Sequence, residues 1–395
     1  MVCRFIISLL MFIFILVTPL GWCGSPYSAN GIGVLIPDDF GISRGLGGAG
    51  IALDNGRNAL RENPALIASF TKPSYSFDVV YNRTTTYTGG TEQPTFGKLS
   101  PRLFKFVFPL SKRVVIGWGL TPLSQTDVSM VIPGDGFSDR VKVTGGVNVS
   151  TTSIAVSFKD FLRLGVSLNY NFGAIQEEWE TTFPDATDLH QSTDTLRRKF
   201  KGYSVSLGAI THVIPHLTIG LGYTGSSDMD LTISVQPEDI TDSETIHTKK
   251  TISLPSIVRF GVSSSFGKRV ITVLDVSLAQ WEKAAKTTKE KEMYNDTYTV
   301  GTGIRFIPST SMTAPYYQTL PLSLGFKVGT MYYKSYPIVD TVLEKAITGG
   351  IEFPFKKSPG SLFVSAEVGT RGDKEKNGWD ETYIIFGLSL LGTIK

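Results

Sequence analysis

The fold is decided by a short stretch in the middle of the chain, LRLGVSLNY at residues 162–170. Large apolar side chains occupy every second position, with small, polar or charged residues between them. A period of two is typical of a β-strand whose two faces meet different surroundings. Similar runs recur to the C-terminus and predict about 14 strands, each near the length that a tilted strand needs to cross a bilayer. The runs lie at residues 75–81, 104–108, 114–120, 154–158, 162–170, 203–209, 217–223, 258–262, 270–278, 298–306, 322–328, 347–353, 362–368 and 384–390.

Composition removes several classes of protein. The 395 residues include 40 glycines and only 18% charged residues, a balance that excludes a disordered or coiled-coil chain. Because 38 basic residues face 35 acidic ones, no charge surplus draws the chain to nucleic acid, and we expect no such partner. Beyond residue 24 there is no run of 18 or more apolar residues, which excludes a protein with several transmembrane helices.

The N-terminus has the pattern of a secretory signal peptide. Arg4 is followed by an apolar run at residues 5–20 and then by GWCG at residues 21–24. A single transmembrane anchor is the alternative, but about 16 apolar residues are short for a span and no Lys/Arg cluster follows. We therefore expect residues 1–24 to be removed. Both cysteines, Cys3 and Cys23, lie in this segment, so the mature chain has no disulfide to stabilise it.

Ionisable residues stand between the apolar positions of the predicted strands. In a soluble sandwich they would face solvent, and in a membrane barrel they would line a polar lumen. We take them as candidate lumen residues: Asp78, Lys105, Arg163, Arg259, Asp275, Arg305, Lys327, Glu352 and Glu367. Aromatic residues near strand ends fit the interfacial girdles of a barrel, namely Trp118, Tyr170, Tyr223, Trp281, Tyr298, Tyr332 and Tyr383.

The connections favour the membrane barrel. Short ones at residues 110–112, 159–161, 214–216, 267–268 and 355–360 alternate with longer ones at 82–99, 121–148, 176–195, 225–254 and 282–296, and only 308–319 breaks the rule. Short periplasmic turns and long outer loops are typical of an up-and-down outer-membrane barrel. We predict an all-β, 14-stranded antiparallel transmembrane barrel over residues 74–395, a multi-pass protein of the cell outer membrane of a Gram-negative-type bacterium.

Residues 25–73 lack this alternation. They contain a glycine-rich motif and a turn motif, Arg44, Gly45, Gly47, Gly48, Ala49, Gly50, Asn63, Pro64 and Ala65. The glycines match G-x-G-x-x-G, but no buried strand precedes them and no βαβ unit follows, so a dinucleotide site is rejected. We expect a compact N-terminal hatch that plugs the barrel and whose turn at residues 63–65 closes the pore.

The same motif resembles the N-terminal hatch signature of the FadL-like (OMPP1/FadL/TodX) outer-membrane transport family. Residues 109–122 and 254–281 resemble the strand patterns of that family, whereas Thr393, Ile394 and Lys395 replace its final aromatic residue. The resemblance implies a 14-stranded barrel plugged by its hatch. It also implies passage of hydrophobic molecules from an outer binding site into the barrel and out through a gap in its wall.

We therefore expect passive uptake of long-chain fatty acids or aromatic hydrocarbons. The alternatives are a FadL-like barrel that serves as a structural or binding component of a protein secretion or surface-anchoring system, and a general porin. Expected partners are outer-membrane lipid and lipopolysaccharide, a hydrophobic small-molecule ligand and the barrel-assembly machinery during biogenesis. We expect the barrel to be a monomer. Outer-loop residues that could capture a hydrophobic ligand are Met130, Ile132, Phe137, Met229 and Leu231.

Catalysis has little support in the sequence. The four histidines are His190, His212, His216 and His247, and His212 and His216 flank Pro215 at an expected turn. A pair four residues apart on a turn lacks the helical spacing of a metal site. We expect no enzyme activity, no cofactor and no metal.

Overall fold

The computed structural model describes residues 24–59, 61–88, 91–92, 96–159, 161–183, 191–236, 246–309, 311, 313–334, 340–355 and 360–394. The expected signal peptide lies outside these residues except for Gly24. Within the described part of the chain, no helix is both long and apolar enough to cross a membrane.

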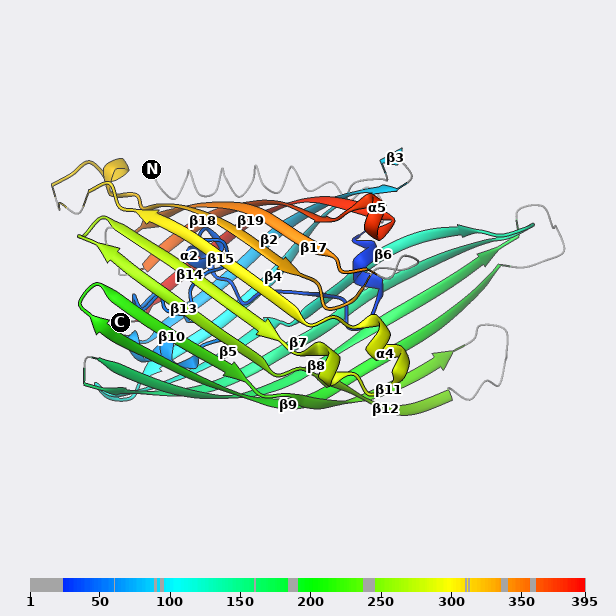
Figure 1. Ribbon diagram of the computed structural model, residues 1–395, viewed down its shortest axis with the longest axis horizontal. Helices are drawn as coiled ribbons and strands as arrows, with labels where there is room; N and C mark the ends of the chain where they lie inside the picture. The colour runs from blue at the N-terminus through cyan, green and yellow to red at the C-terminus, as the bar shows by residue number, and fades with distance from the viewer. Residues whose placement is uncertain are drawn as a thin grey trace.

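The strands form a closed, antiparallel, 14-stranded β-barrel, as expected (Figure 1). Closure comes from the last strand, β19, which pairs with β2 over its whole length, from Trp379 opposite Thr88 to Thr393 opposite Ser74. Eleven wall strands are continuous: β2 (Ser74–Thr88), β4 (Phe96–Pro109), β7 (Ser138–Phe158), β8 (Leu162–Thr182), β9 (Ser192–Ile214), β14 (Val270–Ala279), β15 (Thr297–Phe306), β16 (Leu322–Thr330), β17 (Leu343–Pro354), β18 (Gly360–Gly372) and β19 (Trp379–Thr393).

The other three wall strands are interrupted. They consist of β5 (Val114–Pro122) with β6 (Ser124–Pro133), β10 (Leu217–Thr224) with β11 (Ser227–Gln236), and β12 (Ile246–Leu254) with β13 (Ile257–Phe266). Both β10 and β11 pair with β9, and they pair in turn with β13 and β12. Each pair of labels is therefore one wall strand with a local irregularity.

The two faces of the wall differ as the sequence period predicts. On β9, the side chains of Tyr203, Val205 and Leu207 are 57%, 47% and 50% exposed. Ser204 and Ser206 point to the other side and are buried. A continuous apolar outer belt is stable against acyl chains but not against water, and this is the pattern of a membrane barrel.

Tight connections and longer ones lie at opposite ends of the barrel (Figure 1). The right-hand end carries α3 (Trp281–Ala284), α4 (Thr288–Met293) and α5 (Lys374–Asn377), and the left-hand end carries most short turns and η3 (Tyr316–Thr319). The expected loops at residues 121–148 and 225–254 are instead mostly strand, formed by β6, the first half of β7, β11 and β12. Large outward apolar residues are sparse there, which is why the two-residue rhythm missed these strands.

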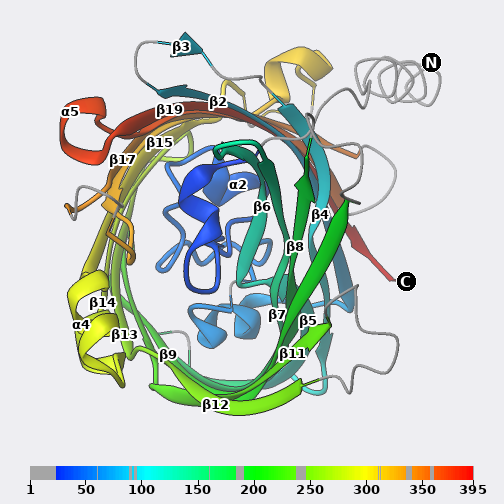
Figure 2. The ribbon, with the colours of Figure 1, turned by 90° about the vertical axis from the view of Figure 1, so that its right-hand side faces the viewer.

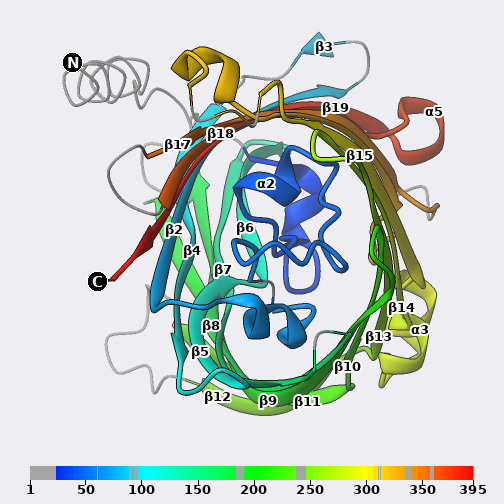
Figure 3. The same ribbon diagram turned by 90° about the vertical axis from the view of Figure 1, so that its left-hand side faces the viewer.

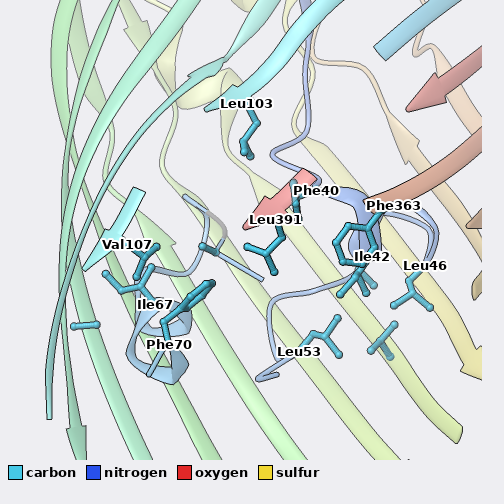
Figure 4. Packing of buried hydrophobic residues seen from close by; sticks show 14 of the residues in the cluster. Phe40, Ile42, Leu46, Leu53, Ile67, Phe70, Leu103, Val107, Phe363 and Leu391 are labelled. Atoms are coloured by element: carbon cyan, nitrogen blue, oxygen red, sulfur yellow. The ribbon is translucent and has the colours of Figure 1, made fainter. Parts of the chain in front are cut away.

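Residues 25–73, which we call the hatch segment, lie inside the barrel (Figures 2 and 3). The segment contains η1 (Pro26–Ala29), β1 (Val34–Leu35), α2 (Gly41–Arg44) and η2 (Pro64–Ser69). Its apolar side chains share one cluster with residues of the wall (Figure 4). The cluster includes Phe40, Ile42, Leu46, Leu53, Ile67 and Phe70 of the hatch segment and Leu103, Val107, Phe363 and Leu391 of β4, β18 and β19.

Candidate functional site in the barrel lumen

Backbone meets backbone where the glycine-rich motif reaches the wall. Gly47 has φ +72°, and a Cβ built on it would lie 2.3 Å from the carbonyl oxygen of Phe326 on β16. Its N–H donates to Thr348 Oγ1 on β17 at 2.9 Å. Gly45 also packs against Gly350 of β17, where a Cβ on Gly350 would be in ordinary contact with the Gly45 Cα at 3.4 Å. Glycine is therefore needed at Gly47 both for its dihedral angle and for the close approach.

Arg44, the last residue of α2, joins the glycine-rich motif to the wall through ion pairs. Its guanidinium pairs with Asp39 at 2.9 Å and with the lumen residue Asp78 on β2 at 2.7 Å. The Arg44 side chain is 2% exposed and that of Asp78 is 0% exposed. Burial alone would lower the pKa of Arg44, but Asp39 and Asp78 outweigh it and raise that pKa well above its usual range. The guanidinium therefore stays charged and joins the hatch segment to the wall.

The end of the glycine motif is held by Asp275 of β14. Its carboxylate accepts hydrogen bonds from the backbone N–H groups of Gly50 at 2.6 Å and Ile51 at 2.8 Å. The Asn58 side chain donates to the carbonyl oxygen of Gly50 at 3.2 Å. Ala49, next to Gly50, is completely buried, and Gly48 turns the chain with φ +78°.

The turn motif Asn63, Pro64, Ala65 contacts the opposite side of the wall. Asn63 is the N-cap of η2, where its side chain accepts from the Ala65 N–H at 3.1 Å and donates to the carbonyl oxygens of Ile51 at 2.8 Å and Ala209 at 3.3 Å. Wall glycines make room for it, since a Cβ on Gly208 would lie 2.2 Å from Asn63 Oδ1. A Cβ on Gly165 would lie 2.5 Å from the Ala65 nitrogen.

The nine candidate lumen residues all turn inward. Besides Asp78 and Asp275, four of them pair with the hatch segment: Lys105 with Asp38 at 3.1 Å, Arg259 with Glu62 at 3.3 Å, Arg163 with Asp54, and Glu352 with Arg57. The other three pair within the wall, Arg305 with Glu352 and Lys327 with Glu367. Because removing one member of a buried ion pair leaves the other uncompensated, each such contact opposes withdrawal of the segment.

The wall is broken beside β6. Residues 104–109 of β4 pair with β5, but residues 96–103 of β4 have no ladder partner on that side among the described residues, because β6 pairs with β7 and with β1 instead. In Figures 2 and 3, β6 lies nearer the hatch segment than β4 does. Next to the interruption between β5 and β6, Gly145 and Gly146 of β7 have φ +124° and +151°. A Cβ on Gly146 would lie 2.3 Å from the Ser124 carbonyl oxygen.

Two cavities lie beside β1, and the larger one adjoins this break. The larger has a volume of about 600 Å³ and is lined on one side by Gly97 and Lys98 of β4 and on the other by Gln125 and Asp127 of β6. Lys98 and Asp127 form an ion pair of 2.6 Å between the two edges. The smaller cavity, of about 250 Å³, is lined by residues that include Ile51, Leu254, Trp281 and Met331. Residues 34–37, which include β1, line both cavities, as do Lys327 and Glu344.

Arg102 is the one cation of the larger cavity that forms no ion pair with a described residue. Arg102 lies at the bulge of β4 where Asp78 pairs with Leu103 and Val79 with Pro101. It lines the cavity, and its Nε has no hydrogen-bond partner among the described residues. Every other cation of the lining, namely Arg44, Lys98, Lys327 and Arg371, is paired with a carboxylate.

An aromatic cluster anchors the start of the hatch segment. Trp281 and Tyr332 stack at 4.1 Å, and the Tyr332 hydroxyl accepts from the Ile32 N–H at 2.9 Å and donates to the Gly33 carbonyl oxygen at 3.1 Å. Burial raises the pKa of Tyr332, so the hydroxyl keeps its proton. The girdle prediction is therefore wrong for Trp281, Tyr332 and Tyr383, which are 2%, 2% and 1% exposed. Trp118, Tyr223 and Tyr298 are exposed on the outside.

The candidate capture residues do not lie together in loops. Met130 and Ile132 belong to β6, Met229 and Leu231 belong to β11, and only Phe137 lies in a turn. Met229 is completely buried, in a cluster that includes Ile32 and Trp281, so its role as a surface capture residue is corrected. Ile132 and Phe137 are 43% and 38% exposed. The described residues also contain no group of three or more side chains suited to hold a metal ion.

Comparison with solved structures places the fold among hydrocarbon-channel barrels. A Pseudomonas aeruginosa FadL homologue superposes with a TM-score of 0.62 at 12% identity, covering 92% of this chain and all of the other. The CymD monoaromatic hydrocarbon channel gives 0.61 at 14% identity, covering 90% and 97%. The Pseudomonas putida toluene transporter TodX gives 0.59 at 13% identity, covering 91% and 99%. At these identities the likeness establishes the fold alone.

Sequence comparison gives the family. No curated protein matches the chain. The family model called BamG matches residues 1–392. The expected FadL likeness thus holds for the barrel, while the matching family carries a different name. The chain belongs to the BamG family.

Proposed function

We propose that this protein is an outer-membrane channel for hydrophobic molecules, closed by the hatch segment and open sideways at the break between β4 and β6. The observation that carries the proposal is the cavity of about 600 Å³, since both edges of the break line it. A pocket of this size is large enough for a small amphiphile. The apolar outer belt supports insertion in a membrane, and the fold shared with hydrocarbon channels supports the substrate class.

The path would pass beside β1. A molecule that entered the smaller cavity near Trp281 would reach the larger one when residues 34–37 move aside, and would leave between Lys98 and Asp127. Two residue pairs join β1 to β6, Val34 with Gln125 and Leu35 with Ser124, and the Ile36 N–H donates to the Leu123 carbonyl oxygen at 2.9 Å, so this movement breaks few hydrogen bonds.

A disulfide tests this path. In a chain from which the signal peptide and its cysteines have been removed, Val34→Cys with Gln125→Cys should lock β1 to β6 and stop uptake of a labelled fatty acid or of toluene until a reductant is added. The matched control places the disulfide between two strands that stay paired, Thr370→Cys with Thr382→Cys. Equal uptake by the oxidised and reduced Val34/Gln125 variant would contradict the path.

Arg102 favours an anionic amphiphile over a neutral hydrocarbon. A carboxylate next to this guanidinium would gain a charge-assisted hydrogen bond that toluene cannot make. Arg102→Gln should weaken fatty-acid binding by about tenfold or more, from a loss of about 1.5–3 kcal/mol, and leave toluene binding unchanged. Equal losses for both ligands would instead indicate a general disturbance of the cavity.

The hatch segment is proposed as the closure of the pore, with the turn at Asn63, Pro64 and Ala65 sealing one side of the lumen. Deleting residues 25–70 should raise ion conductance in planar bilayers. A barrel that stays closed after the deletion would refute this role, and a wild-type barrel that admits sugars in liposome swelling would favour the general porin.

A second candidate is a structural or binding component of a protein secretion or surface-anchoring system. Its support is the length of β7, β8 and β9, which have 21, 21 and 23 residues and, together with β6, β11 and β12, extend beyond the rest of the wall (Figure 1). The many ion pairs that hold the hatch segment also suit a barrel that does not open. A deletion strain with normal fatty-acid uptake and missing exported proteins would favour this candidate.

A further inference from the structure

The outer face of β9 changes from apolar to basic along its length. Leu207, Val205 and Tyr203 form part of the exposed apolar belt. The next three outward positions are Lys201, Lys199 and Arg197, all exposed. With a rise of about 3.3 Å per residue, successive cations stand about 6.6 Å apart along the strand.

The sheet register adds a fourth cation. Thr232 of β11 stands opposite Lys199 of β9 on one side and opposite Lys249 of β12 on the other. Directly opposed residues share a face, so Lys199 and Lys249 point outward about 10 Å apart. We call Arg197, Lys199, Lys201 and Lys249 the basic patch. Within the described residues, none of these four has a hydrogen bond or an ion pair from its side chain.

Acidic residues near the patch do not neutralise it. Asp230 stands opposite Lys201. Glu178 and Glu180 lie on β8, where they pair with Lys142 and Arg140 of β7 at 3.5 and 3.4 Å. The other outward neighbours on β8, at positions 172, 174 and 176, are neutral. Three of the four cations thus remain uncompensated among the described neighbours.

Aromatic side chains mark the level of the patch in the membrane. Tyr170 of β8 lies 5.0 Å from Tyr203 and 5.4 Å from Phe172, measured between ring centroids. Exposed aromatic residues of membrane proteins gather at the boundary between acyl chains and headgroups. Lys201 follows Tyr203 toward the end of the barrel opposite the short turns, so the patch lies at headgroup level on that side.

We infer that the basic patch binds the phosphate groups of a lipid in the outer leaflet. Lys199 and Lys249 flank one phosphate, Arg197 and Lys201 reach its neighbours, and the acyl chains lie along Tyr203, Val205 and Leu207. Arginine and lysine are suited to phosphate oxygens, and basic clusters next to a membrane surface attract anionic lipid. This site is on the outside of the wall and does not depend on what passes through the lumen.

The test uses the whole mature protein extracted in a mild detergent. The variant R197Q/K199Q/K201Q is compared with the wild type and with the control R140Q/K142Q, whose cations are already paired. Each protein is titrated with purified lipid A and with dephosphorylated lipid A, and the bound lipid is counted by native mass spectrometry. We expect the patch variant to bind lipid A at least about tenfold more weakly, because each basic residue contributes severalfold to affinity. The control should bind like the wild type.

Three results would overturn the inference. They are equal lipid A binding by the patch variant and the wild type, equal binding of the dephosphorylated lipid by the wild type, and loss of a co-purifying acidic protein in place of lipid. A fourth contrary result is release of bound lipid A by millimolar inorganic phosphate, which would make the patch a site for free phosphate. A shift in mobility between unboiled and boiled samples on gels confirms that each variant is folded.

Discussion

The two parts of the hatch segment are attached to the barrel in different ways. Residues 40–70 touch the wall through glycine backbone and buried ion pairs, as at Gly47 and Arg44. Residues 25–37, of which 34–37 border both cavities, carry no charged side chain and are held by hydrogen bonds and apolar packing, as between Tyr27 and the Trp379 carbonyl oxygen at 2.8 Å and in the two residue pairs of β1 with β6. The contrast indicates a fixed body and a lightly held arm, so a hydrophobic molecule would meet less resistance beside the arm.

The largest loss of stability should follow replacement of Arg44, which lies in the fixed body. Arg44→Met leaves Asp39 and Asp78 as buried carboxylates without their cation, which should lower the free energy of unfolding by about 3–5 kcal/mol. Urea titration in vesicles, followed by gel mobility of unboiled samples, measures the loss. Asp78→Asn should have a smaller effect, because Arg44 keeps Asp39. A change below about 1 kcal/mol for Arg44→Met would mean that the body is not held by this pair.

Two neighbouring glycines separate backbone strain from contact with the wall. Gly47 and Gly48 have similar dihedral angles, φ +72° and +78°, but a Cβ on Gly48 would meet nothing within 4 Å. Gly48→Ala should therefore cost about 1 kcal/mol from the dihedral angle alone. Gly47→Ala should cost about 2–3 kcal/mol, because its Cβ also overlaps the Phe326 carbonyl. Equal losses in the same urea titration would show that the motif does not need the close approach.

The strands of the wall were predicted well, because every second side chain faces lipid and is therefore apolar. The run at residues 162–170 became the first part of β8, and Leu164, Val166 and Leu168 are exposed on its outer face. The same reasoning failed beyond the membrane, where the outward residues of β11 and β12 are polar and the strands were taken for loops. The inward Met229 was consequently taken for a surface residue.

The sequence alone did not reveal which residues pair with one another inside the lumen. Alternation identified Asp78, Arg259 and Glu352 as inward residues, but their partners Arg44, Glu62 and Arg57 lie in a segment without periodicity. The break beside β6 was also missed, although Pro122 and the pair Gly145, Gly146 signal an interrupted strand. The segments that depart from regular alternation are those that border the cavities.

Removal of the Tyr332 hydroxyl should locally destabilise the arm, residues 25–37. Tyr332→Phe removes the acceptor of the Ile32 N–H and the donor to the Gly33 carbonyl, but keeps the stacking on Trp281. The expected cost is about 1 kcal/mol, felt mainly as faster hydrogen exchange in residues 31–36. Exchange of residues 44–51 should stay as in the wild type. Faster exchange in both parts would contradict the division into a fixed body and a lightly held arm.

The smallest effect should come from the ion pair across the wall break. Lys98 and Asp127 are 50% and 33% exposed, so Lys98→Gln should change the free energy of unfolding by less than about 1 kcal/mol and less still in high salt. Because the pair spans the two edges beside the larger cavity, the same change should make the release of a labelled amphiphile faster. Arg140→Gln, which removes a similarly exposed ion pair between β7 and β8, is the control. If both variants release the amphiphile at the wild-type rate, the break is not where it leaves, and the light attachment of the arm must serve another purpose.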